Sequence, residues 1–344
     1  MTGAPLRNRY FVQRPGAAAA EAWDPRDRER PPTRDCVYVG GVLEAMERHL
    51  DEGGLTFHVT WDVHALPSYG PDVVAVVLGD EAARMPAYAG RVRAVFKCYG
   101  TEPFLGVSPL RDRSYASVRA AAHYLRARLE RAPGALRRGR GAGRVFDLPL
   151  GYYNQLDLPI RDPRDRGADV FFAGSVVQDA TRRGLLERTL GTPKALSRTS
   201  MLRELHRLAA REPSLVVRTT TTAGFSAVHT ADAHSYSEAL MDARICLAPR
   251  GSSWETFRFF EGLRYGCVVV TEALPSRWFY DGAPVIRVRD WRELGPAVAG
   301  VLRDEGTLRG WHERALAWWR DRCSEAAVGR YVAERLTRDA PRPG

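Results

Sequence analysis

The most informative stretch for predicting the fold is RICLAPRGSSWETFRFFEGLRYGCVVVTE, residues 244–272. Its two ends are apolar and β-branched runs, RICLAPRG (244–251) and CVVVTE (267–272), which predict two strands. Pro249 ends the first strand, a Gly-Ser-Ser turn follows at 251–253, and residues of helical composition begin near Trp254. A strand, a turn, a helix and a second strand form the unit from which parallel sheets are built.

The same alternation extends along the chain in both directions. Further strands are expected at 36–41, 55–61, 72–80, 91–100, 168–175, 214–222 and 284–288. Helical segments are expected around 42–50, 81–89, 113–130 and 291–337. Strands with nearly continuous apolar character, separated by helices, indicate parallel sheets covered on both faces. The sequence therefore predicts an α/β fold with Rossmann-like parallel sheets.

The chain length of 344 residues suggests two domains, at about 150 residues each. A Pro- and Arg-rich stretch interrupts the alternation and predicts a linker. The expected organisation is a loosely ordered segment at 1–32, an N-terminal domain at 33–157, a linker at 158–167, a C-terminal domain at 168–320, and a C-terminal helix and tail at 321–344.

The composition, with 44% hydrophobic and 27% charged residues, excludes a disordered, collagenous or coiled-coil chain. The net charge is +10, and only two of the 51 cationic side chains are lysines, Lys97 and Lys194. This arginine excess fits either GC-rich codon usage or an anionic ligand, for which the guanidinium is suited. The five cysteines form no C-x-x-C pair, and the chain shows no signal peptide or spanning segment. A cytoplasmic protein with no membrane insertion is expected.

The Gly-Ser-Ser turn at 251–253 predicts an anion site. Ser252 or Ser253 is the expected N-cap, and the free amides of the first helical turn attract a phosphate beside Arg250. Arg258 and Glu261, three residues apart, share a helix face. The carboxylate suits ribose hydroxyls and the guanidinium suits a diphosphate. The alternative is an ordinary surface salt bridge between these two side chains.

The same residues resemble a known family signature. LAPRG (247–251) and FRFFEGLRYGCVVV (257–270) are similar to the exostosin family of glycosyltransferases, which has a Pro-Arg-Gly turn, an aromatic-flanked Arg, a helix Glu and a Cys-Val-Pro-Val strand. Val269 stands where that family has a proline. Two upstream segments match in family order: FFAGS (171–175) with TRRGLL (181–186), and FDLPL (146–150).

The resemblance implies a GT-B glycosyltransferase with two facing Rossmann-like domains. The C-terminal domain would bind a nucleotide-sugar donor, expected to be UDP-linked, and the N-terminal domain a hydroxyl-bearing acceptor. No metal and no further cofactor is expected, because amides and basic side chains stabilise the leaving diphosphate. A bacterial member without a membrane anchor would act in natural-product or glycan biosynthesis. The donor residues implied by position are Gly174, Ser175, Arg182, Arg250, Gly251, Ser252, Ser253, Thr256, Arg258 and Glu261.

An inverting transferase, the expected type, needs a base for the acceptor hydroxyl. In an α/β domain that base should follow an N-terminal-domain strand. Glu102 is preferred because it follows a polar turn at the end of a buried strand; Asp80, Asp147 and His64 are the other candidates. Each has a competing interpretation as a turn or cap residue. A retaining enzyme would need no such base.

Weaker signals leave other interpretations open. Thr219 to Thr222, followed by His229 and His234, are expected in the loop after a strand, where they could contact the donor; the alternative is that this β-branched run is simply strand. The two histidines lack the helical spacing of zinc proteases, so no metal site is predicted. A nucleic-acid-binding protein would explain the charge, but no helix-turn-helix, zinc module or RNP-type motif is found. A non-catalytic nucleotide- or carbohydrate-binding protein with a transferase-like fold is the other alternative.

Overall fold

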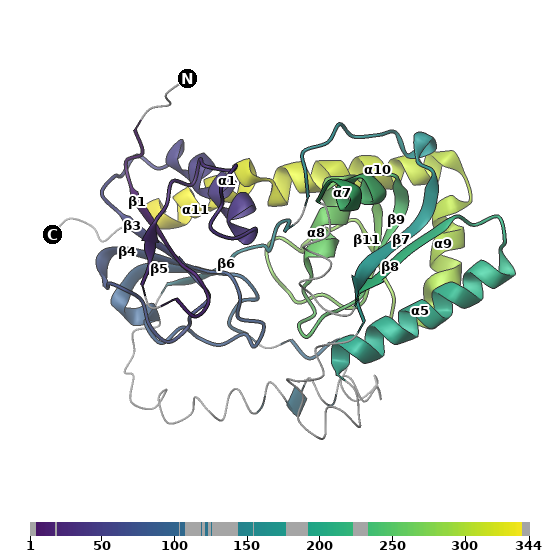
Figure 1. The fold of residues 1–344 in the computed structure, drawn as a ribbon, viewed down its shortest axis with the longest axis horizontal. Coiled ribbons are helices and arrows are strands. Elements are labelled where there is room, and N and C mark those ends of the chain that lie inside the picture. The colour runs from purple at the N-terminus through teal and green to yellow at the C-terminus, as the bar shows by residue number, and fades with distance from the viewer. Residues whose placement is uncertain are drawn as a thin grey trace. The chain divides into compact units, whose positions relative to one another are not determined.

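The computed structural model describes residues 5–17, 19–102, 104–106, 118, 121–122, 125, 144–153, 155–176, 192–222 and 233–338. The chain forms two compact units (Figure 1). Unit 1 comprises Met1–Pro103, His123–Tyr153 and Arg320–Gly344, and unit 2 comprises Phe104–Ala122 and Asn154–Trp319. The chain therefore enters unit 2 twice and returns to unit 1 after each passage, the second time at its C-terminal end.

Unit 1 contains a six-stranded sheet in the order β2-β1-β3-β4-β5-β6. Its strands are β1 (Arg9–Gln13), β2 (Glu21–Ala22), β3 (Thr56–Thr60), β4 (Gly70–Val77), β5 (Val92–Lys97) and β6 (Val145–Asp147). All neighbouring pairs are parallel except β1 with β2. The helices α1 (Asp35–Glu47) and α11 (Glu325–Arg338) pack against each other. A short 3-10 helix at Ala89–Arg91 precedes β5.

Three predictions for unit 1 are wrong. Residues 36–41, predicted as a strand, lie in α1, where residues on almost every side are buried. A helix that is apolar on all sides gives the same uninterrupted apolar run in the sequence as a strand buried on both faces. The segment 1–32 is not loosely ordered throughout, because β1 pairs in parallel with β3 and buries Tyr10 and Val12. No α-helix forms at 81–89, where Pro86 interrupts the segment.

Unit 2 contains a five-stranded sheet in the order β11-β10-β9-β7-β8, and all its pairs are parallel. Its strands are β7 (Ala168–Ser175), β8 (Val217–Thr222), β9 (Ala243–Ala248), β10 (Val268–Thr271) and β11 (Val285–Arg287). Its helices are α5 (Pro193–Arg211), α7 (Ala233–Met241), α8 (Phe257–Arg264), α9 (Leu294–Leu302) and α10 (Glu305–Trp318), with 3-10 helices at Pro163–Asp165 and Trp291–Glu293. A π-helix at Trp319–Cys323 follows α10. Two mostly parallel sheets confirm the predicted α/β class.

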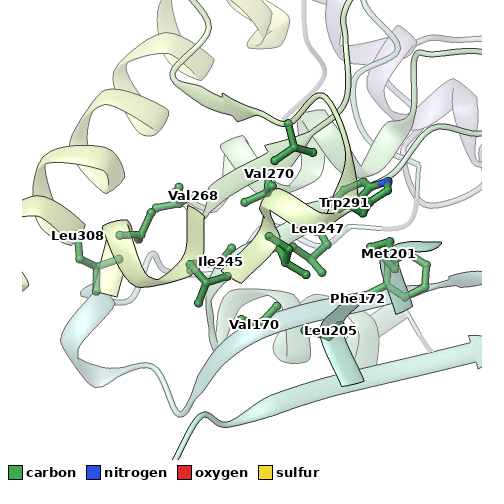
Figure 2. Close-up of a cluster of buried hydrophobic side chains, with 14 residues drawn as sticks. Val170, Phe172, Met201, Leu205, Ile245, Leu247, Val268, Val270, Trp291 and Leu308 are labelled. Atoms are coloured by element: carbon green, nitrogen blue, oxygen red, sulfur yellow. The ribbon is translucent and has the colours of Figure 1, made fainter. Parts of the chain in front are cut away.

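Helices cover both faces of the unit 2 sheet. On one face, side chains of β7, β9 and β10 pack against Met201 and Leu205 of α5 and against Trp291 (Figure 2). On the other face α8 approaches closely, because a Cβ at Gly262 would fall 2.8 Å from Val269 Cγ2. Glycine at this position therefore lets α8 rest directly on β10, which places the start of α8 beside the carboxyl ends of the central strands.

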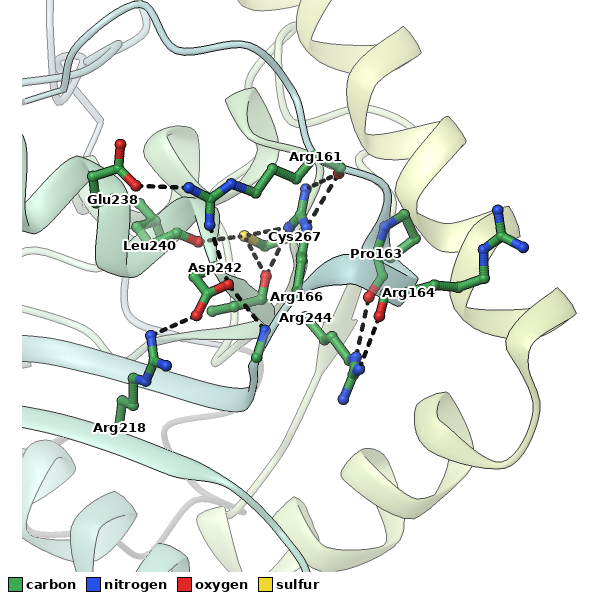
Figure 3. Close-up of polar contacts among 12 residues, drawn as sticks. Arg161, Pro163, Arg164, Arg166, Arg218, Glu238, Leu240, Asp242, Arg244 and Cys267 are labelled. Atoms are coloured by element: carbon green, nitrogen blue, oxygen red, sulfur yellow. Dashed lines mark hydrogen bonds and ion pairs between the residues drawn. The ribbon is translucent and has the colours of Figure 1, made fainter.

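The predicted linker at 158–167 belongs to unit 2 and is firmly bonded to it (Figure 3). The Arg166 guanidinium is 1% exposed and donates to the carbonyl oxygens of Ala243, at 2.7 Å, and Tyr265. Asp242 accepts from the backbone N–H of Gly167 at 2.9 Å. Because a buried guanidinium satisfied by carbonyls is costly to expose, Arg166 anchors the end of this segment to unit 2, although most of the other residues of the segment are exposed. The predicted C-terminal helix likewise packs into unit 1 as α11.

Candidate functional site

Four buried cations gather where β7 and β9 end. Gly174 and Ser175 close β7, and Arg250 follows β9. The cationic side chains are Lys194 and Arg198 of α5, Arg250, and Arg258 of α8, all at most 9% exposed. Because β7 and β9 are neighbouring parallel strands, their carboxyl ends lie at one edge of the sheet, the edge where open α/β folds bind ligands.

Helix α5 supplies two of these cations, and both contact the end of β7. Lys194 Nζ donates to Ser175 Oγ at 2.7 Å. Arg198 Nη1 donates to the carbonyl oxygen of Ser175 at 2.6 Å, and its Nε donates to that of Arg250 at 3.3 Å. These acceptors are neutral, so the hydrogen bonds hold the cations in place without cancelling their charge.

Arg250 is held in the turn after β9 by its side chain and its backbone. Its guanidinium lies 3.9 Å above the Trp254 ring and donates to the Ser252 carbonyl oxygen at 3.1 Å. Its backbone N–H donates to Glu272 Oε2 at 2.9 Å, and Ser197 Oγ donates to the same oxygen at 2.7 Å. Burial raises the pKa of Glu272, opposed by these hydrogen bonds and by the Arg250 charge.

Arg258 is a buried cation with no carboxylate partner among the described residues. Its guanidinium lies over the Phe172 ring at 4.9 Å, and its buried Nε has no hydrogen-bond partner. Within the described ranges no carboxylate forms an ion pair with it. A Cβ at Gly174 would fall 2.7 Å from Arg258 Nη2, so glycine leaves room for this guanidinium. A buried cation is expensive unless a counter-charge offsets it, which points to an anionic ligand.

Glu261 lies one helical turn from Arg258 and has a different partner. It is 3% exposed, and Tyr236 OH of α7 donates to its Oε2 at 2.6 Å. The backbone carbonyl oxygen of Glu261 accepts from Gln155 Nε2 at 2.8 Å. The alternative of a surface salt bridge between Arg258 and Glu261 is therefore wrong, because both side chains are buried and they form no ion pair.

The helix after the turn begins later than predicted. Its N-cap is Thr256, which makes no side-chain cap bond, so the expected caps Ser252 and Ser253 are wrong. Ser253 Oγ instead accepts from the backbone N–H of Glu255 at 3.3 Å. Glu255, the residue before the N-cap, is buried in an ion pair with Arg277 at 2.9 Å. Gly251 and Ser252 lie in this longer turn.

Several residues of the site have little signal in the sequence. Trp254 is 6% exposed, and no residue in the described part of the chain accepts from its buried Nε1–H. Lys194 is one of two lysines and opens a helix, which was a usable signal. Arg198 and Tyr236 lie in ordinary helical stretches, and nothing in the sequence around them marks them as site residues. Glu272 is a carboxylate directly after a predicted strand, and this pattern is a usable signal for a residue at the carboxyl edge of a sheet.

The other predicted residues of unit 2 have no shown role in this cluster or fall outside the described residues. Arg182 and His229 fall outside them. Thr219 to Thr222 belong to the edge strand β8, as the alternative interpretation of this run as a simple strand predicts, and Thr221 and Thr222 are the register partners of Gly174 and Ser175. His234 is exposed on α7, 4.0 Å from Glu238 Oε1. Within the described ranges no group of three or more His, Cys, Asp or Glu side chains is arranged to hold a metal ion.

The four candidate bases lie at the carboxyl ends of unit 1 strands: Glu102, Asp80 and His64 follow a strand, and Asp147 is the last residue of one. Glu102 is exposed beyond the end of β5. Asp80, after β4, is buried, forms ion pairs with Lys97 at 3.2 Å and Arg84 at 2.8 Å, and accepts from the Arg84 backbone N–H. Although burial opposes it, the Lys97 charge leads the interactions that lower the pKa of Asp80. These contacts indicate a structural carboxylate.

Asp147 and His64 are the two remaining candidates. Asp147 is half-buried at the last position of β6. His64 is exposed in the loop after β3, with its Nε2 3.3 Å from Arg84 Nη1. Both therefore lie at the edge of the sheet where an acceptor base is expected.

Comparisons with known proteins give only remote likenesses. No protein-family model matches the sequence, and no curated protein matches it. Among solved structures, a chain of the GtfA/B complex aligns with 10% identity and a TM-score of 0.41, over 89% of this chain and 60% of that one. AviGT4, a glycosyltransferase involved in avilamycin A biosynthesis, aligns with 15% identity and a TM-score of 0.37, over 97% and 98%.

A third solved structure, Anabaena HepE in complex with UDP, aligns with 13% identity and a TM-score of 0.37, over 90% of this chain and 79% of that one. The fold class rests on the two parallel sheets themselves, and the resemblance to exostosins stays a prediction. The described residues include no helix long and apolar enough to cross a membrane.

Proposed function

We propose that the protein is a GT-B glycosyltransferase with an exostosin-like donor site in unit 2. It would transfer a sugar from a nucleoside-diphosphate donor, first of all a UDP-sugar, to a hydroxyl of an acceptor in natural-product or glycan biosynthesis. The observation that carries this proposal is the Arg258 guanidinium, buried beside Gly174 without a carboxylate partner among the described residues. A diphosphate is the ligand that matches one uncompensated cation surrounded by three others.

In this proposal the cations stabilise the leaving group. As the bond between the sugar and the diphosphate breaks, negative charge grows on the diphosphate oxygens. Lys194, Arg198, Arg250 and Arg258 are already fixed by packing and hydrogen bonds, so little reorganisation is needed to meet that charge. The cations replace a metal ion in this role, and we propose a metal-independent reaction.

Glu261 is the proposed ribose ligand. The hydrogen bond from Tyr236 fixes the orientation of its carboxylate, and burial strengthens any hydrogen bond that it accepts from a ribose hydroxyl. A carboxylate accepts two such bonds, which suits a vicinal diol. Tyr236 is therefore a positioning residue for nucleoside recognition.

For the acceptor we propose an inverting reaction with Glu102 as the base. Glu102 follows β5 at the carboxyl edge of the unit 1 sheet and is exposed, as a group that meets an incoming substrate must be. Asp80 is less suited, because its oxygens are bonded to Lys97 and Arg84. The buried cations of unit 2 also cannot face a nucleic acid duplex, which disfavours the nucleic-acid alternative for this cluster.

The direct test is nucleotide binding without metal. UDP at 100 times its dissociation constant should stabilise the protein by about 2.7 kcal/mol, measured as a melting shift in EDTA. GDP and TDP identify the base, and sodium sulfate at equal ionic strength is the control. A shift that disappears in EDTA would contradict metal independence. An equal shift with sulfate, or none with any nucleotide, would overturn the donor site.

A further inference from the structure

Unit 1 has a pocket of its own, separate from the cation cluster and from the candidate bases. It lies on the sheet face formed by alternate residues of β1 and β3, and its volume is about 790 Å³. The loop at 65–69, the first residues of β4 and residues 19–20 complete its lining. This volume falls within the range of small-molecule sites. None of the four candidate bases lines it.

Two lining residues carry buried polar atoms that no described residue satisfies. His58 is 4% exposed; its Nε2 lies 2.8 Å from Ser68 Oγ, and its Nδ1 has no hydrogen-bond partner. Gln13 donates from Nε2 to the Ala17 carbonyl oxygen at 3.3 Å, and its buried Oε1 has no partner. Native proteins satisfy nearly all such atoms, so two in one pocket indicate a polar ligand.

The charge of the lining distinguishes this ligand from the proposed donor. Its charged side chains are one cation, Arg9, and one carboxylate, Asp72. Arg9 Nη2 donates to Thr56 Oγ1 at 2.8 Å, and Asp72 makes no ion pair within the described ranges. Burial lowers the pKa of His58, which keeps the imidazole neutral at physiological pH. The lining side chains therefore carry one positive and one negative formal charge, and the Arg91 guanidinium beside Tyr69 adds a second cation next to the pocket. These surroundings are less positive than the four-cation cluster of unit 2, so a neutral ligand fits them better than a diphosphate.

The remaining lining is apolar and partly aromatic. Phe11 and His58 are register partners on β1 and β3, and their rings lie 5.5 Å apart. The Arg91 guanidinium covers Tyr69 at 3.5 Å from the ring centroid. Arg91 thus covers one face of Tyr69, whereas the Phe11 and His58 rings are tilted by 33° relative to each other. The aromatic surface of the lining is suited to C–H contacts. A ligand that fits must combine several hydroxyl groups with an apolar C–H face.

We propose that this pocket binds a neutral saccharide unit, with Gln13 Oε1 accepting from one hydroxyl and His58 Nδ1 bonded to another. A sugar ring carries hydroxyls around its edge and C–H groups on its faces, which matches both parts of the lining. The inference goes beyond the proposed function and does not depend on it, because the pocket lies wholly in unit 1.

The test uses the full-length protein and saturation-transfer NMR with methyl glucoside, methyl galactoside, methyl mannoside and maltose. His58→Phe keeps a ring beside Phe11 but removes both nitrogens, and Gln13→Met removes the carboxamide at similar volume. His49→Phe, at an exposed position outside the pocket, is the matched control. Arg258→Met tests whether saccharide signals arise from unit 2 instead. Thermal melts confirm that each variant folds.

We expect at least one saccharide to bind, with affinity at least fivefold weaker in His58→Phe and in Gln13→Met and unchanged in His49→Phe and Arg258→Met. If His58→Phe fails to fold, Gln13→Met decides. No binding by any saccharide would overturn the inference, as would full affinity in Gln13→Met. If uridine or adenosine binds tightly and the same substitutions weaken that binding, the inference is also overturned, and the pocket is assigned to a nucleoside. UDP binding tests the donor site independently.

Discussion

Replacing Arg258 by methionine should move stability and ligand affinity in opposite directions. Methionine keeps much of the volume over Phe172 but removes a buried charge that has no carboxylate partner in the described part of the chain. Desolvation of a buried ion costs several kcal/mol, and a desolvated cation–π contact returns about 2 kcal/mol. The net effect on the ligand-free protein should be a gain of about 1 kcal/mol, or roughly 2–4 °C in Tm.

The same change should weaken UDP binding. A hydrogen bond to a charged group contributes about 1.5–3 kcal/mol, which corresponds to a roughly 10- to 100-fold rise in Kd. Calorimetric titration with UDP in EDTA measures the affinity, and urea unfolding without ligand measures the stability. Arg264→Met, on the same helix, is the matched control: Arg264 donates to the Leu156 carbonyl oxygen at 2.8 Å, so its loss should lower stability and leave UDP affinity unchanged.

Two results would refute this reasoning. If Arg258→Met destabilises the ligand-free protein as much as Arg264→Met does, the Arg258 charge is satisfied without a ligand. If its UDP affinity equals that of the unmodified protein, the guanidinium does not contact the diphosphate, and the proposed donor site is wrong even if the chain binds UDP elsewhere.

Three further predictions test the ribose ligand, the base and the buried pair of unit 1. Glu261→Gln should weaken UDP binding by about 1.5–3 kcal/mol in titration calorimetry, since charge-assisted bonds to ribose are lost, whereas the exposed control Glu238→Gln should bind UDP normally. Glu102→Gln should bind UDP normally but transfer sugar about 10²- to 10⁴-fold more slowly in a turnover assay; near-normal turnover would eliminate this base. Asp80→Asn should destabilise the protein at pH 7, because it leaves Lys97 buried beside a neutral group. As the pKa of Asp80 is lowered by folding, its contribution is present above the unfolded pKa, about 3.9, and is lost as pH falls through the folded value. The difference between Asp80→Asn and the unmodified protein in urea unfolding should therefore shrink below pH 4, and a constant difference would contradict the ion pair.

The central strands β7 and β10 of unit 2 were predictable because their burial leaves a local signature. The predicted strand at 168–175 matches β7 residue for residue, and the one at 267–272 contains β10. A strand buried on both faces by helices must be apolar along its whole length, so a few adjacent residues suffice to identify it. The same rule failed at 36–41, because a helix buried on nearly all sides produces the same local run.

Local sequence patterns were enough to predict the α/β class, the parallel strands and the Pro-Arg-Gly turn that brings Arg250 to a strand end. The contacts of the site became visible only in the folded chain: Arg258 lies beside Gly174, and Glu261 accepts from Tyr236. The same holds for Lys194 and Arg198, which come from a separate helix, and for His58 and Gln13, which line one pocket. The difference comes from the distance along the chain over which each interaction acts. Strand and turn preferences act between residues a few positions apart, whereas the neighbours of a buried charge come from segments that meet only when the sheet has formed.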